Sequence, residues 1–262
     1  MPRIVAVANQ KGGVGKTTTT INLAASLALA ERRVLLVDVD PQGNLTSGVG
    51  RKNQASPAGT IYNALTSIDP TVDARPFLIP TAIDGLELIP ADRSLTGAEI
   101  ELVALSVREE RLRLLLASVR NDFDYIFIDC PPSLGLMTLN ALVAADAVLI
   151  PLHCEYFALE GLADLVGTMR RVRAALNPSL DLEGVLLTMF DERTNLGQQV
   201  ATDVRQFFNE KVFRTVIPRN VRLGEAPSHG MPVILYDVKS RGAEAYLALA
   251  REVLERSAAT AE

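Results

Sequence analysis

Aromatic residues and cysteines are scarce in this sequence of 262 residues. Tryptophan is absent and aromatic residues make up only 5% of the chain, which argues against a surface that stacks bases on aromatic rings. The two cysteines, Cys130 and Cys154, do not form a C-x-x-C pair, and no cluster of cysteine and histidine has the spacing of a zinc site. We expect two buried, free thiols in a reducing compartment.

Long apolar runs are also lacking. The most apolar stretch, residues 141–152, is interrupted by Asp146 and is too short to cross a bilayer. The N-terminal residues lead directly into an expected strand and a glycine-rich loop, without the features of a signal peptide. We therefore expect a soluble, cytoplasmic protein that does not bind membranes. Because the formal net charge is -5, nucleic-acid binding would need a local basic patch.

Hydrophobic patterning predicts an alternation of strands and helices. Continuous apolar runs rich in valine and isoleucine indicate strands buried on both faces, as in a parallel sheet covered by helices. The expected strands are residues 4–8, 34–38, 125–129, 147–152, 184–189 and 212–217, and the expected helices are residues 17–30, 99–119, 160–176, 196–209 and 241–256. This order predicts a doubly wound α/β fold with a mostly parallel sheet and helices on both faces, in a single domain of residues 1–262.

The expected helix at residues 99–119 carries a broad apolar stripe. The stripe consists of Ile100, Val103, Val107, Leu114 and Leu115, with charged residues partly outside it. Apolar residues at this spacing lie on one face of a helix. We therefore expect this helix to pack its stripe against the core.

A glycine-rich loop at residues 9–18 lies between the first expected strand and the first expected helix. Its sequence fits the phosphate-binding pattern G-x-x-x-x-G-K-[ST], except that Gln10 replaces the first glycine. Glycines let backbone N–H groups approach phosphates, and the helix N-terminus adds unpaired donors. We expect Lys16 to reach the β- and γ-phosphates of a nucleotide and Thr17 to ligate Mg²⁺. Taken alone, Lys11 could equally be a solvated loop lysine.

Three carboxylates lie at the ends of expected strands. Asp38 and Asp40 follow the run at residues 34–37, and Asp129 ends the run at residues 125–129. Ligands of open α/β sheets bind at these strand ends. A single aspartate in such a place is most often a helix cap or a turn former. Three of them after a phosphate loop instead indicate a site for a metal ion and an attacking water.

The loop from Lys11 to Thr18 resembles the deviant Walker A loop of the ParA/MinD superfamily of P-loop ATPases. The resemblance implies that Lys11 crosses a dimer interface and touches the partner's nucleotide, as the lysine counterpart of an arginine finger. It also implies that Asp40 orients or activates the attacking water and that Asp38 lies near Mg²⁺. Asp129 resembles the Walker B acid, which holds Mg²⁺ through water.

Further segments resemble the bacterial ParA/Soj partition ATPases, so that the resemblance covers essentially the whole chain. These segments are residues 188–191, 193–197, 217–223, 225–230 and 240–244. The match is specific to the short chromosomal form, because the phosphate loop begins at residue 11 and the N-terminal operator-binding module of longer relatives is missing. The resemblance implies an ATP-bound homodimer that coats double-stranded DNA nonspecifically on the nucleoid. A ParB-type centromere-binding partner would stimulate hydrolysis and release the dimer.

The resemblance also assigns the nucleotide contacts. They are Lys11, Gly12, Gly13, Val14, Gly15, Lys16, Thr17 and Thr18 in the loop, with Met189, Pro218 and Asn220 around the adenine. The strand-end rule for such folds agrees with this position of the adenine pocket. Residues 218–220 could also form a plain turn.

A basic segment is the candidate for DNA contact. From residue 193 to residue 222 the chain has six basic residues and two acidic ones, although the whole chain is acidic. Lysine and arginine contact DNA phosphates without reading sequence. The family resemblance implicates Arg193 and Arg222. Without that resemblance, the segment would be read as an ordinary solvated surface.

Two other functions remain open. The first is a MinD-like ATPase that binds a membrane through a basic amphipathic C-terminal helix. The C-terminal segment at residues 247–256 is instead balanced in charge, and we expect it to pack on the sheet. The second is an ATP-dependent metabolic enzyme of related fold, such as an amidoligase, for which the sequence offers no candidate acceptor site.

Overall fold

The computed structural model describes residues 2–155 and 158–259 of the chain. Its strands are β1 (Arg3–Val7), β2 (Val34–Asp38), β3 (Ile79–Pro80), β4 (Leu86–Ile89), β5 (Tyr125–Asp129), β6 (Ala147–His153) and β7 (Asp181–Thr188). Its α-helices are α1 (Lys16–Leu29), α2 (Asn44–Gly48), α3 (Ile61–Leu65), α4 (Leu95–Glu101), α5 (Arg111–Ala117), α6 (Leu136–Ala144), α7 (Ala158–Ala175), α8 (Asn195–Phe208), α9 (Val221–Glu225), α10 (Val233–Tyr236) and α11 (Arg241–Ala259). Short 3₁₀ helices, η1 to η5, cover Arg75–Phe77, Leu102–Ala104, Arg120–Asp122, Asn209–Lys211 and Ala226–His229.

The strands form one seven-stranded sheet in the order β3-β4-β2-β5-β1-β6-β7. All neighbouring strands are parallel except β3 and β4, which pair antiparallel. The chain therefore has the doubly wound, mostly parallel α/β fold that the sequence predicts. Strand β1 lies between β5 and β6, so the strand order reverses beside its carboxyl end. Ligands of open α/β sheets bind at this switch point.

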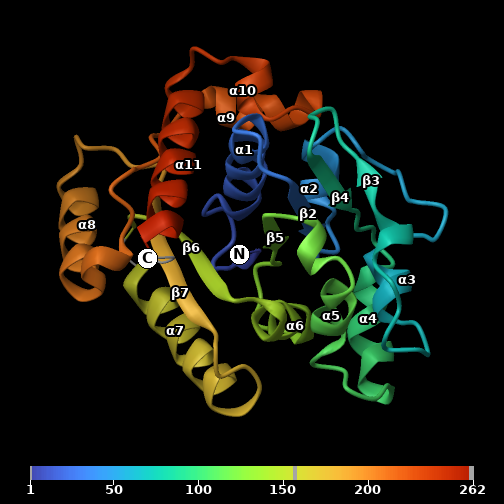
Figure 1. The fold of residues 1–262 in the computed structure, drawn as a ribbon. Coiled ribbons are helices and arrows are strands. Elements are labelled where there is room, and N and C mark those ends of the chain that lie inside the picture. The colour runs from blue at the N-terminus through green and yellow to red at the C-terminus, as the bar shows by residue number, and fades with distance from the viewer. Residues whose placement is uncertain (1, 156–157, 260–262) are drawn as a thin grey trace.

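Helices cover both faces of the sheet, and successive residues of β1 point to opposite faces. Ile4, Ala6 and Ala8 join a core cluster with residues of α5, α6 and α7. Val5 and Val7 join the other cluster, with residues of α1 and α11. Figure 1 shows α1 and α11 on one side of the sheet and α6 and α7 on the other. The alternation of a strand thus supplies both cores.

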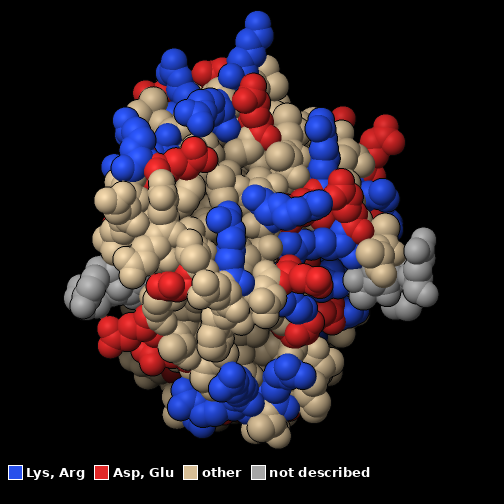
Figure 2. Space-filling model, turned by 90° about the vertical axis from the view of Figure 1, so that its left-hand side faces the viewer, with Lys and Arg blue, Asp and Glu red and all other residues tan. Residues whose placement is uncertain are grey.

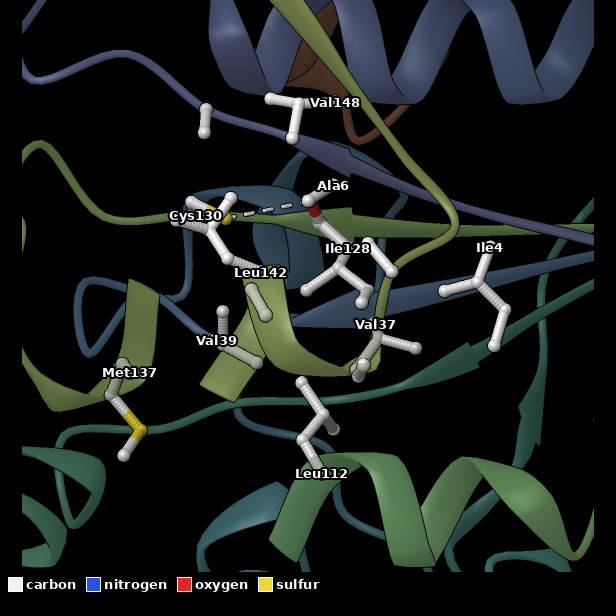
Figure 3. Close-up of a cluster of buried hydrophobic side chains, with 14 of the residues drawn as sticks. Ile4, Ala6, Val37, Val39, Leu112, Ile128, Cys130, Met137, Leu142 and Val148 are labelled. Atoms are coloured by element: carbon white, nitrogen blue, oxygen red, sulfur yellow. Dashed lines mark hydrogen bonds between the residues drawn. The ribbon is translucent and has the colours of Figure 1, made fainter. Parts of the chain in front are cut away.

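The core cluster on the face of α6 and α7 contains both cysteines. In Figure 3, Cys130 lies among aliphatic side chains from the strands and from α6. Its Sγ donates a weak hydrogen bond of 3.9 Å to the carbonyl of Ile128. Cys130 and Cys154 are both free and buried, as expected from the sequence. Burial raises the pKa of Cys154 to about 11, so this thiol stays protonated at neutral pH.

The prediction of a single helix at residues 99–119 is wrong. The chain forms α4 and η2, leaves helical geometry, and resumes as α5. Val107 has a left-handed backbone with φ of 48°, and the buried Arg111 donates to the carbonyl of Ser106, which the break leaves free. Ile100 and Val103 of the expected core stripe are instead 79% and 60% exposed.

The prediction of a strand at residues 212–217 is also wrong. This segment runs beside β7 and bonds to it only at intervals, through Phe213 N to Val185 O at 3.0 Å and Ile217 N to Leu187 O at 2.9 Å. Between these points, the backbone N–H groups of Arg214 and Thr215 donate to the carboxylate of Glu252 on α11, at 2.8 and 2.9 Å. A buried side chain therefore replaces the ladder that the apolar pattern predicts.

Strands β3 and β4 were not predicted, because they are only two and four residues long and carry little periodicity. Within residues 2–155 and 158–259, no helix combines the length and the apolar character needed to span a bilayer.

We predict that Glu252→Ala destabilises the protein by about 2–4 kcal/mol, because it removes a buried carboxylate that accepts from the backbone N–H groups of Arg214 and Thr215 and pairs with Arg256. Urea unfolding followed by circular dichroism measures this change. Glu244→Ala on the exposed side of the same helix is the matched control and should change stability by less than about 0.5 kcal/mol. Equal effects of the two substitutions would contradict the role given to Glu252.

Candidate functional site

The glycine-rich loop leaves the carboxyl end of β1 and enters α1. Gly13 and Gly15 have left-handed backbones, with φ of 72° and 87°, which residues with a Cβ rarely adopt. Gly15 directly precedes α1, and no side chain in the described part of the molecule caps the helix there. The first N–H groups of α1 are therefore open to an anion in the loop.

Lys16 places a buried cation beside this loop. The residue is 7% exposed, and its Nζ donates a hydrogen bond of 3.1 Å to the backbone carbonyl of Lys11. Burial lowers the pKa of Lys16, while the charge of Asp129 acts in the opposite direction. A poorly solvated ammonium group gains strongly from a negative ligand, so Lys16 is suited to contact a phosphate.

Asp129 connects β5 to α1 through two threonine hydroxyls. Thr17 Oγ1 donates to Asp129 Oδ2 at 2.7 Å, and Thr20 Oγ1 donates to Asp129 Oδ1 at 3.0 Å. Asp129 is completely buried, and its burial, together with the charge of Asp38, raises its pKa to about 8. Burial also raises the pKa of Asp38 to about 6. Two buried carboxylates that repel each other favour a bound cation.

The donors around Asp129 fit Mg²⁺. The Thr17 hydroxyl and the Asp129 carboxylate supply the oxygen atoms that this ion prefers. Residues 2–155 and 158–259 contain no group of three or more His, Cys, Asp and Glu side chains placed to hold a metal. Mg²⁺ commonly binds through one or two protein oxygens, water and nucleotide phosphates rather than through a protein cage. The site thus suits a Mg²⁺ ion that enters with a nucleotide.

Asp38 and Asp40 both follow β2 but have different surroundings. Asp38 accepts hydrogen bonds from the backbone N–H and the hydroxyl of Thr46, at 2.9 and 2.7 Å, and from the backbone N–H of Asp40 at 3.1 Å. It is completely buried and anchors α2. Asp40 lines the cavity described next, and its Oδ1 accepts from the backbone N–H of Gln42 at 2.9 Å. Asp40 is therefore the carboxylate within reach of a ligand.

A cavity of about 920 Å³ opens above the loop. The expected nucleotide contacts that line it are Gly12, Gly13, Gly15, Lys16, Thr17, Thr18, Met189 and Asn220. Val14 lies behind the loop, where its carbonyl accepts a hydrogen bond of 2.8 Å from the Thr188 hydroxyl. Pro218 lines a neighbouring cavity of about 720 Å³ with Arg193. The structure therefore gathers most of the expected contacts, while Val14 and Pro218 lie beside the cavity.

One wall of the cavity was not predicted from the sequence. Leu223, Gly224, Pro227 and Ser228 line it from α9 and η5. The backbone that follows this wall packs closely on the chain after α2. A Cβ added at Gly50 would lie only 2.9 Å from the carbonyl oxygen of Gly230. In the sequence, the indication of this wall is the resemblance of residues 225–230 to the ParA/Soj ATPases. No local pattern in these residues indicates contact with a ligand.

Lys11 lies apart from the other loop residues that were predicted to contact nucleotide. Its Nζ donates to Glu155 Oε2 at 2.5 Å, at the end of β6. Lys11 is not among the described residues that line the cavity. In this single subunit its ammonium group therefore points to a carboxylate of its own chain.

The two candidate DNA contacts are paired with acids. Arg193 forms two bonds with Asp191, from Nε to Oδ1 at 2.9 Å and from Nη2 to Oδ2 at 2.7 Å. Arg222 lies 2.8 Å from Glu225 and 3.2 Å from Asp237. Figure 2 shows acidic and basic side chains interspersed in the middle of one face, with basic side chains gathered towards its top and bottom. The local positive charge counted in the sequence is thus partly neutralised in space.

The buried carboxylate of Asp129 should make the stability of the protein depend on pH. In the protein without nucleotide and Mg²⁺, Asp129 holds its proton up to a pKa of about 8, whereas the unfolded chain releases it near 3.8. The folded state therefore binds more protons in this window, and its stability falls as pH rises towards 8. We predict that Asp129→Asn, which cannot ionise, gains stability relative to wild type between pH 6 and pH 8. Urea unfolding at several pH values measures the difference between the two curves.

Asp164→Asn is the matched control for this measurement, because Asp164 is an exposed carboxylate on α7. Its stability curve should run parallel to that of wild type over the whole range. Asp129→Asn and wild type would also run parallel if Asp129 were already ionised in the folded state, and that result would contradict the prediction.

Comparisons with known proteins agree with this fold. A family model described as an AAA domain matches residues 2–182. The chromosome partitioning protein ParA of Myxococcus xanthus is 59% identical over 97% of this chain and 88% of its own length. The sporulation initiation inhibitor protein Soj of Bacillus subtilis is 56% identical over 97% of this chain and 98% of its own length.

A solved structure from Mycobacterium smegmatis, that of a cobyrinic acid a,c-diamide synthase with bound ADP and magnesium, is 40% identical. It superposes with a TM-score of 0.82 over 97% of this chain and 94% of that one. The cell division ATPase MinD of Pyrococcus furiosus is 25% identical, with a TM-score of 0.79 over 97% of this chain and 99% of its own. The full-length similarity to ParA and Soj, at more than half of all positions, shows that the chain belongs to the ParA/Soj family of chromosome-partitioning ATPases.

Proposed function

We propose that this chain is a Mg²⁺-dependent ATPase of DNA partition, which dimerises with ATP, coats DNA nonspecifically on the nucleoid and is released by hydrolysis. The observation that carries the proposal is the loop-and-carboxylate site, in which Lys16, Thr17 and Asp129 meet at the switch point of the sheet. The similarity to ParA and Soj over 97% of the chain supports the partition role. A ParB-type centromere-binding protein is the partner that we expect to stimulate hydrolysis.

Each residue of the loop has a separate task in this proposal. The glycines and the N-terminus of α1 bind the phosphates, and Lys16 neutralises the β- and γ-phosphates. Thr17 and Asp129 hold Mg²⁺, with Asp38 behind them. Mg²⁺, when bound, lowers the charge repulsion between the phosphates and polarises them. Met189 and Asn220, together with the wall from α9 and η5, surround the base.

Asp40 is the residue that we propose to orient the attacking water. It lines the cavity and is only 7% exposed. One oxygen accepts the backbone N–H of Gln42, which fixes the carboxylate in the segment after β2. A carboxylate held in this way can accept a hydrogen bond from a water molecule and direct the oxygen lone pair towards the γ-phosphate.

Lys11 and the basic side chains connect this site to dimerisation and DNA. We propose that Lys11 contacts the nucleotide of the partner subunit in the dimer, where it stabilises charge on the transferred phosphoryl group. Arg193 and Arg222 are proposed to contact DNA phosphates. Their present partners are acids of the same chain, so each contact with DNA replaces an exposed ion pair of small free energy. Two patches in one dimer bind more tightly than one.

The similarity to the Mycobacterium smegmatis synthase raises an alternative function, an ATP-dependent amide ligase. The higher identity to ParA and Soj, 59% and 56% against 40%, favours the partition ATPase. The two functions differ in what stimulates ATP turnover. Turnover that requires a small carboxylic acid and a nitrogen donor, and that ignores DNA, would establish the ligase.

We predict that Asp40→Ala lowers the rate of ATP hydrolysis by about 100-fold or more, because the attacking water loses its acceptor. ATP affinity should change by no more than a few-fold, since Asp40 does not bind the phosphates in this proposal. Single-turnover hydrolysis and equilibrium dialysis measure the two quantities. Asp164→Ala, on the exposed side of α7, should leave both unchanged. Normal hydrolysis by Asp40→Ala would remove Asp40 from the mechanism.

We also predict that ATP, but not ADP, makes the Asp40→Ala protein co-sediment with DNA, and that binding weakens as salt rises. Adding Arg193→Glu and Arg222→Glu should abolish binding at moderate salt while dimerisation persists. The charge-matched control is Arg32→Glu with Arg33→Glu, two exposed residues between α1 and β2. Loss of DNA binding in the control as well would indicate an effect of net charge. Undiminished binding of the Arg193/Arg222 variant would place the DNA interface elsewhere.

A further inference from the structure

Lys11 is held at the end of β6 by contacts of both its backbone and its side chain. Its backbone N–H donates to Asn9 Oδ1 at 2.9 Å, and Asn9 Nδ2 donates to the carbonyl of Pro151 at 2.8 Å. Its Nζ donates to Glu155 Oε2 at 2.5 Å. The start of the loop and the lysine ammonium group therefore both rest on the strand that neighbours β1.

The carboxylate of Glu155 is engaged on both oxygens. Oε2 accepts from Lys11, and Oε1 lies 3.0 Å from His153 Nδ1. The backbone N–H of Glu155 donates to the carbonyl of His153 at 2.8 Å, which fixes the short turn that carries the carboxylate. The hydrogen bond from Lys11 lowers the pKa of Glu155, and the positive charge of Arg219, a residue of the cavity wall, acts in the same direction. Glu155 is thus held by contacts with His153 as well as by its contact with Lys11.

The contact between Lys11 and Glu155 is suited to being broken. The two side chains are 37% and 48% exposed, and an exposed pair of this kind contributes little to stability because water competes for both charges. A buried structural pair would be costly to separate. An exposed pair beside a nucleotide cavity can instead open when a stronger anion is offered to the lysine.

We propose that Glu155 is a positioning residue that retains Lys11 in the isolated subunit, so that release of Lys11 from Glu155 is a step in forming the ATP-bound dimer. This inference rests on the proposed role of Lys11 towards the nucleotide of the partner subunit. Each subunit of a dimer has to open one such contact. The retention therefore opposes dimerisation twice, and it keeps the lysine away from a nucleotide bound to its own chain.

The test measures ATP-induced dimerisation of Glu155→Gln in the Asp40→Ala background by sedimentation velocity. Glutamine keeps the length of the side chain and removes its charge. With two exposed ion pairs opened per dimer, the dissociation constant of the dimer should fall by about 2- to 25-fold. Glu155→Asp, which withdraws the carboxylate by one methylene group, should give an intermediate value. It also provides a second variant if the glutamine protein folds poorly.

Two controls separate retention from other effects. Glu160→Gln removes an exposed carboxylate on α7 and should leave dimerisation as in the parent. In a Lys11→Ala background, Glu155→Gln should have no effect, because the contact is already absent. A purely structural role of Glu155 would persist in that background.

The outcomes distinguish this inference from the proposed function. A tighter dimer that depends on Lys11 supports the retention of Lys11 by Glu155. Unchanged or weaker dimerisation of Glu155→Gln, while Lys11→Ala impairs dimerisation or hydrolysis, overturns the retention and leaves the function standing. Normal dimerisation and hydrolysis of Lys11→Ala would instead overturn the proposed role of Lys11 itself.

Discussion

The hydrogen bonds from Thr17 and Thr20 to the buried carboxylate of Asp129 are the interaction on which the site depends. They connect the end of β5 to the first two turns of α1, directly after the glycine-rich loop. The loop therefore cannot move without disturbing the centre of the sheet. The same carboxylate has a raised pKa because it is buried beside Asp38, so the protein holds an electrostatic strain that a bound cation relieves. The two buried carboxylates thus lower the stability of the protein without a cation and favour the binding of one.

Several charged groups of the single subunit are satisfied by acids of their own chain. Lys11 is paired with Glu155, Arg193 with Asp191, and Arg222 with Glu225. All three pairs are exposed, and such pairs are weak. A molecule with these pairs can exchange internal acids for phosphates at low cost. The proposed contacts with DNA and with a second copy would each replace one such weak pair.

Much of the fold was predictable because its central strands are continuous apolar runs. The strands expected at residues 34–38 and 125–129 have the observed bounds of β2 and β5. The helix expected at residues 99–119 failed because a backbone break at Val107 and the buried Arg111 interrupt it. The strand expected at residues 212–217 failed because Glu252 takes its N–H groups. In the first case a local backbone break outweighed the apolar pattern, and in the second case a side chain from α11 did so.

The sequence by itself determined the nucleotide loop and its neighbours. Glycine spacing, a following lysine and threonine, and aspartates at strand ends are local features, and a parallel sheet brings strand ends together by its geometry. Only the tertiary structure decided which of these groups face the cavity. Asp40 lines it and Asp38 anchors α2, while Lys11 meets a carboxylate 144 positions away. Contacts between residues so distant in the chain leave no local pattern, because chain folding alone brings them together.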